Sequence, residues 1–145
     1  MKAPLYLFTV GLGIVLTVHL AMNGKVGVVL NNPRVGNSLF WCIGAAMAIV
    51  IGLSGWQSGA LSGLKGMNPI LLTAGAFGAC LVFAIAWLIP QIGAGPMTLY
   101  LLAGQIAGAM VLSHFGWLGS PVQPITMMSA LGALVMFAGV VLATR

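Results

Sequence analysis

Long uninterrupted runs of apolar residues, separated by short stretches rich in Pro, Gly and Asn, make up almost the whole chain. A helix needs about 20 apolar residues to cross the hydrocarbon core of a bilayer. A membrane β-barrel would instead show alternating segments of about ten residues, and the runs here are continuous. The pattern therefore predicts one transmembrane domain over residues 1–145, with five α-helices at about 5–30, 38–56, 69–89, 96–113 and 124–143.

Prolines mark several of the predicted helix boundaries. Pro69, Pro96 and Pro124 stand where a first helical turn would begin, the position at which the missing N–H costs least. Pro90 is expected to end the third helix. The connector at 57–66 is rich in small residues and is expected to be partly helical.

Composition removes the alternative of a soluble fold. Of the 145 residues, 61% are hydrophobic and 3% are charged, and Asp and Glu are absent. A soluble protein of this length needs a polar surface that these residues cannot supply. The surrounding medium must therefore be lipid.

The net charge of +5 does not indicate a nucleic-acid partner, because the five basic residues are scattered singly along the chain. Lys2, Arg34, Lys65 and Arg145 are expected to anchor loops and termini in the lipid headgroup region. Five crossings would place two of these residues on each side of the membrane. Either two opposite copies then form an antiparallel dimer, or one orientation is set by a partner subunit or by Lys25.

Polar side chains inside the spans are the functional candidates, because hydrogen-bonding and ionisable groups are costly at bilayer depth. His19, Asn23 and Lys25 cluster near the end of the first span. One interpretation is that the helix breaks at Asn23-Gly24 and opens a pocket; the other is that the helix ends near Met22 and all three are interfacial. Gln105, in the fourth span, could bind substrate or hold helices together.

The absence of Asp and Glu also limits the chemistry of transport. A chain acting alone would have to couple protons through His19, His114 or Lys25. It would recognise cations through aromatic faces such as Trp41 and Trp87, or through backbone carbonyls. No nucleophile–base pair, phosphate loop or metal-ligand cluster is recognisable, so we expect no enzyme, no metal and no cofactor.

Several short motifs occur along the chain in a specific order and spacing. The first helix carries Ala-Met-Asn-Gly-Lys-Val-Gly at 21–27, followed by Asn-Pro at 32–33. Further matching segments lie at 75–79, 88–94, 103–106, 113–116, 131–133 and 138–139. In order and spacing these motifs resemble the YdcZ-type branch of the drug/metabolite transporter superfamily. Together they cover nearly the whole chain.

The resemblance implies a half-size, five-helix exporter of a bacterial inner membrane, with an inverted-repeat architecture completed by a second copy or by a sister subunit. It also implies that Asn23, Lys25 and Gln105 line a central cavity, and that Pro90 with Gly93 forms a structural break. One departure is Ser113, where the family often has Asp before His-Phe-Gly.

Two hypotheses about function follow. The first is a secondary transporter that exports a small molecule by alternating access, with His19, Asn23, Lys25, Trp41 and Gln105 as the substrate-binding candidates. The second is a non-transporting membrane subunit that scaffolds or stabilises a larger complex.

Overall fold

The computed structural model describes residues 3–145, so the predicted headgroup anchor Lys2 lies outside the described residues. Within this range the chain forms helices and no strand. The five α-helices and three short 3-10 helices are α1 (Ala3–Val29), α2 (Pro33–Ser54), η1 (Ser62–Gly66), η2 (Pro69–Thr73), α3 (Ala74–Ile92), α4 (Ala94–Phe115), η3 (Trp117–Gly119) and α5 (Met127–Ala143).

The predicted class of all-α membrane protein is confirmed. Four segments are long and apolar enough to cross a bilayer: Pro4–Val29, Pro33–Ser54, Pro69–Ile92 and Ala94–Phe115. The fifth helix, α5, has 17 residues and a length of about 26 Å, which is at the lower limit for a crossing. Large apolar side chains are exposed on the helices, among them Phe8 at 66% and Leu142 at 74%, as expected for surfaces that face lipid.

The first helix corrects both interpretations of its polar end, because α1 neither breaks at Asn23-Gly24 nor ends near Met22. It continues without interruption to Val29. Surroundings without water offer the backbone no other hydrogen-bonding partner, and this keeps even an Asn-Gly pair helical.

Two proline predictions also differ from the structure. Helix α3 does not end at Pro90 but continues to Ile92, and Gly93, at φ 86°, separates it from α4. Pro124 lies before α5 rather than in its first turn. That helix starts later because Thr126 and Ser129 form a reciprocal capping box at its N-terminus.

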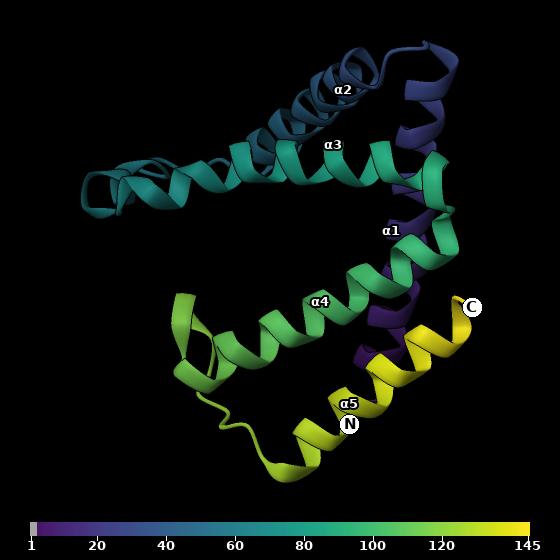
Figure 1. Ribbon diagram of the computed structural model, residues 1–145. Helices are drawn as coiled ribbons and strands as arrows, with labels where there is room; N and C mark the ends of the chain where they lie inside the picture. The colour runs from purple at the N-terminus through teal and green to yellow at the C-terminus, as the bar shows by residue number, and fades with distance from the viewer. Residues whose placement is uncertain (1–2) are drawn as a thin grey trace. The chain divides into compact units, whose positions relative to one another are not determined.

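The described residues form two compact units, which are divided between Gln91 and Ile92. In the first unit α1 and α2 form a helical hairpin, from whose turn the two helices diverge (Figure 1). Asn32 fixes the start of α2, because its side chain accepts hydrogen bonds from the backbone N–H groups of Arg34 and Val35 at 3.1 and 3.3 Å. Helix α2 therefore begins at Pro33, five residues before the predicted start.

Glycine permits the close approach of α1 and α2 beside this turn. A Cβ atom added to Gly36 would lie 2.8 Å from Cα of Gly27, closer than real Cβ atoms come to other atoms. Both glycines are buried. The hairpin thus depends on two backbones in direct contact, the arrangement that small residues allow between membrane helices.

Helix α3 packs against both helices of the hairpin. Asn37 of α2 donates from Nδ2 to the carbonyl of Ala79 at 3.5 Å, and the Trp41 ring lies against Gly78. On the α1 side, a Cβ atom on Gly24 would lie 3.0 Å from the carbonyl oxygen of Ala86. The first unit is therefore a three-helix assembly.

The second unit is the pair α4 and α5 with the segment between them. Helix α4 ends at Phe115 and is followed by Gly116, whose φ of 66° is left-handed. The segment then folds back onto α4: the Ser113 carbonyl accepts from the backbone N–H of Gln123 at 2.8 Å, and Nδ1 of His114 accepts from that of Ile125 at 3.0 Å.

Candidate functional site

Asn23 is the most unusual polar residue of the described chain. Its side chain is 3% exposed, and neither its Nδ2 nor its Oδ1 atom has a hydrogen-bond partner among the described residues. Leaving one buried polar atom without a partner costs about 1–3 kcal/mol. A ligand that carries both a donor and an acceptor would satisfy this amide.

Two cavities of the first unit meet at Asn23. The larger, which we call the α1–α2 cavity, has a volume of about 410 Å³ and lies where the two helices diverge. This volume is within the range of small-molecule sites. It is lined by His19, Met22, Asn23, Val26, Gly36, Leu39, Phe40, Ile43 and Gly44.

The smaller cavity, which we call the α1–α3 cavity, has a volume of about 180 Å³. Its lining residues are Asn23, Gly24, Gly27, Val28, Pro33, Ala86, Trp87, Pro90 and Gln91. Neither cavity is lined by a Lys or an Arg. Asn23 therefore offers an uncharged hydrogen-bonding group to two mainly apolar spaces.

Pro90 contributes to the α1–α3 cavity through the backbone of α3. Proline has no N–H, so residue 90 cannot make the helical hydrogen bond to the carbonyl of Ala86. Gly24 of α1 lies against this carbonyl, as the distance to its hypothetical Cβ atom shows. Pro90 thus removes one helical donor to this carbonyl, which lies at the contact between α1 and α3.

Aromatic rings extend the wall of the α1–α2 cavity. The ring centroids of His19 and Phe40 are 4.8 Å apart, and those of Phe40 and Trp41 are 5.7 Å apart. Trp41 is half-buried, and its Nε1 atom has no hydrogen-bond partner in the part of the chain that the structure describes. The structure therefore brings His19 and Asn23 to one cavity and connects Trp41 to it through Phe40.

Lys25 and Gln105 do not line the α1–α2 cavity with His19 and Asn23. Lys25 lies two residues after Asn23, is exposed, and lines neither cavity. Gln105 is exposed on α4 in the second unit. It does not line the cavity of about 290 Å³ in that unit, which is formed by Ile106, Ala109, Met110, Ser113, Gln123, Pro124, Ile125 and Ser129.

A family model matches residues 4–142, and its description is "Putative inner membrane exporter, YdcZ". The chain belongs to the YdcZ family. No curated protein and no solved structure matches the chain. The YdcZ assignment, with four apolar helices of spanning length, makes this chain a multi-pass protein of the inner membrane in a family of exporters. Exporters move their cargo rather than transform it.

The first-helix motif at 21–27 is one of the motifs that carry the YdcZ resemblance, and it contributes to the cavities and to the helix packing. Asn23 faces the two cavities, and Gly24 and Gly27 make the close contacts to α3 and α2. Ser113 holds the segment before α5 through its carbonyl, and its hydroxyl lies 3.1 Å from that of Ser120.

Sequence reasoning missed Asn37. Its Oδ1 atom is buried without a partner among the described residues, and Asn37 and Trp41 stand four residues apart on the α3-facing side of α2. The predicted start of the second helix at residue 38 left Asn37 in a loop. The Asn32-Pro33 pair, a capping residue followed by a helix-starting proline, was the signal that could have corrected this.

Proposed function

We propose that this YdcZ-family chain exports a small uncharged molecule and binds it in the α1–α2 cavity through the Asn23 amide. The observation that carries the proposal is a buried amide with two unpartnered atoms at the wall of a cavity of about 410 Å³. Binding sites for small molecules are typically apolar spaces with a few placed polar groups. The α1–α2 cavity has this composition.

The class of cargo follows from the lining. A charged molecule would lose its hydration in a space that offers no opposite charge, and this costs far more than one hydrogen bond returns. A mostly apolar molecule, with one group that both donates and accepts hydrogen bonds, loses little hydration on entering the cavity. Such a molecule would pair with Asn23 and pack against Phe40 and His19.

The same lining favours transport over the alternative of a scaffolding subunit. A scaffold is expected to use a buried amide to bind another helix, so the amide would stabilise the assembly. An amide that serves a transient cargo instead lowers stability while the site is empty. The two roles therefore predict opposite effects of removing it.

Alternating access requires a second half that this chain does not contain by itself. An odd number of helices cannot divide into two inverted repeats, so we propose an antiparallel dimer with a second copy or a sister subunit. The balance of basic residues, two on each predicted side, allows both orientations. The bound molecule would then be exposed to each face in turn.

The test is the variant Asn23→Leu, which has a similar volume and no hydrogen-bonding group. We use N-phenyl-1-naphthylamine as the probe, an uncharged and mostly apolar aromatic amine that tests the donor half of this pairing, because its N–H can donate to Asn23 Oδ1. Loss of this bond should lower the export rate at low probe concentration about tenfold, the factor that 1.4 kcal/mol represents. The free energy of unfolding should stay the same or increase, because the unpaired amide is gone.

The matched control is Thr9→Leu, an exposed position on the same helix, remote in sequence from the residues that line the cavity. Its export rate should equal that of the unsubstituted chain. Unchanged export by Asn23→Leu would refute the cavity assignment. Two results together would favour the scaffolding role. Cells that contain the unsubstituted chain would retain as much probe as cells without it, and Asn23→Leu would make the assembly less stable.

A further inference from the structure

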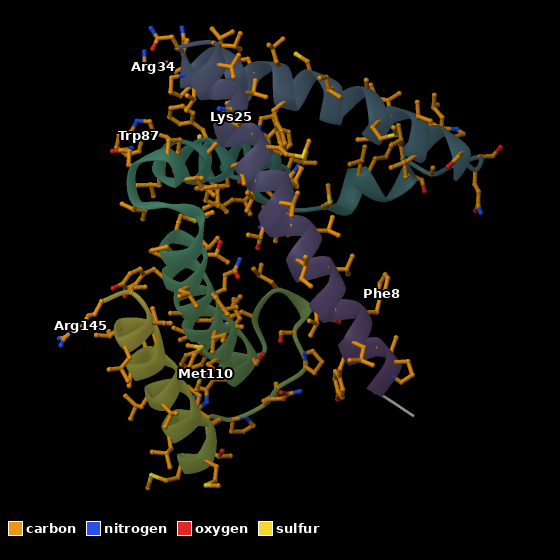
Figure 2. The ribbon with its side chains drawn as sticks, turned by 90° about the vertical axis from the view of Figure 1, so that its right-hand side faces the viewer. Phe8, Lys25, Arg34, Trp87, Met110 and Arg145 are labelled. Atoms are coloured by element: carbon orange, nitrogen blue, oxygen red, sulfur yellow. The ribbon has the colours of Figure 1, made fainter. Side chains whose placement is uncertain are left out.

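A second, separate groove lies at the end of the first unit where α1 turns into α2. It has a volume of about 550 Å³ and is lined by Asn31, Asn32, Pro33, Arg34, Phe83 and Trp87. It shares Pro33 and Trp87 with the α1–α3 cavity but does not include Asn23. Figure 2 shows Arg34, Lys25 and Trp87 at this same end of the unit.

No acidic side chain is available to pair with Arg34. The sequence contains no Asp or Glu. Among residues 3–145, Arg34 forms hydrogen bonds to side chains through its backbone N–H and carbonyl groups and none through its guanidinium. The Asn32 amide oxygen is already occupied by the cap of α2, whereas the Asn31 side chain is not used in this way. The groove therefore offers a forked cationic donor that an external anion can satisfy.

The opposite wall of the groove is aromatic. Phe83 and Trp87 stand four residues apart and so share one face of α3. They lie about 14 and 8 Å from the end of that helix at Ile92, by the rise per residue. Arg34 is the second residue of α2, at the end of a spanning segment. The groove thus leads from the headgroup level into the hydrocarbon.

We propose that this groove binds an anionic phospholipid of the inner membrane. The headgroup phosphate accepts hydrogen bonds from the Arg34 guanidinium and from the Asn31 amide. One acyl chain lies along Phe83 and Trp87. A bare phosphate would satisfy the cation but leave the aromatic wall uncovered, whereas a phospholipid matches the charge at one end and the apolar surface at the other.

The experiment measures which lipid occupies the groove, with Trp87 as the reporter. The full chain, with Trp41, Trp56 and Trp117 replaced by Phe, is reconstituted in phosphatidylcholine bilayers. Brominated phosphatidylglycerol or brominated phosphatidylcholine, each of which quenches nearby indole fluorescence, is then added in steps. We expect about a fivefold preference for the anionic lipid, the effect of one basic residue at a membrane surface.

Arg34→Gln should remove this preference, and Lys65→Gln, which removes a charge from the η1 segment, should leave it unchanged. In the chain that retains Arg34, raising the salt concentration should lower the preference for the anionic lipid. This comparison does not depend on the folding of a variant. Excess glycerol phosphate should lower the quenching by the anionic lipid no more than sodium chloride of equal ionic strength does.

Three results would overturn the proposal. The first is equal quenching by the two lipids with Arg34 present. The second is a preference that survives Arg34→Gln or does not respond to salt. The third is displacement of the lipid by glycerol phosphate, which would show a site for soluble phosphate esters instead.

Discussion

The contact between Gly27 and Gly36 allows a sharp test of the packing in the first unit. In Gly36→Ala the new methyl carbon would lie 2.8 Å from Cα and 2.9 Å from the backbone nitrogen of Gly27. Both neighbours are backbone atoms, so no side chain can rotate to make room. An ordinary contact needs at least 3.4 Å, and the two helices must therefore separate by about 0.6 Å or more at this point.

Two effects of opposite sign determine the magnitude. Inserting a methyl group into a closely packed contact costs about 1–3 kcal/mol. Replacing Gly by Ala within a helix returns about 0.5–1 kcal/mol. Gly52→Ala, on the same helix, should gain the helix stabilisation without the cost of the inserted methyl group. Nothing lies within 4 Å of the position that its Cβ would occupy. The two variants should therefore differ by about 1–3 kcal/mol.

The assay is the reversible unfolding of the purified chain in mixed micelles with increasing dodecyl sulfate, followed by circular dichroism in both directions. Gly36→Ala should unfold at a lower dodecyl sulfate fraction than the unsubstituted chain, and Gly52→Ala at an equal or higher one. Equal stability of Gly36→Ala and Gly52→Ala would refute a direct backbone contact between α1 and α2.

The remaining predictions concern the second unit and the assembly. His114→Leu removes the acceptor of the Ile125 N–H, so the amide of Ile125 should exchange faster with deuterium while amides inside α4 keep their protection; equal exchange at Ile125 would argue against this bond. Reporters fused beside Lys2 or after Arg145, in separate proteins, should each be found on both sides of the inner membrane if the dimer is antiparallel. A single clean orientation would exclude that arrangement for two copies of this chain.

The membrane class, the helices and the short list of polar candidates were predictable because they depend on local properties. Length and apolar content decide that a segment crosses lipid, and lipid forces its backbone to be helical. The family was recognisable from motifs such as that at 21–27, and the match over residues 4–142 confirms it. The predicted helix starts at Ser38 and Pro124 differ from the structure, because the side chains of Asn32 and Thr126 cap α2 and α5 at other positions. The third helix was predicted to end at Pro90 and continues to Ile92.

Only the tertiary structure decided which polar residue faces a cavity. Asn23 and Lys25 are two residues apart, which places them about 200° apart around an α-helix. Helix α1 is apolar on nearly every side, so its sequence contains no stripe that distinguishes a packed face from a lipid face. The contacts of Gly24 with α3 and of Gly27 with α2 fix its rotation. They turn Asn23 inward and leave Lys25 exposed, because only close backbone packing can select a face in a uniformly apolar helix.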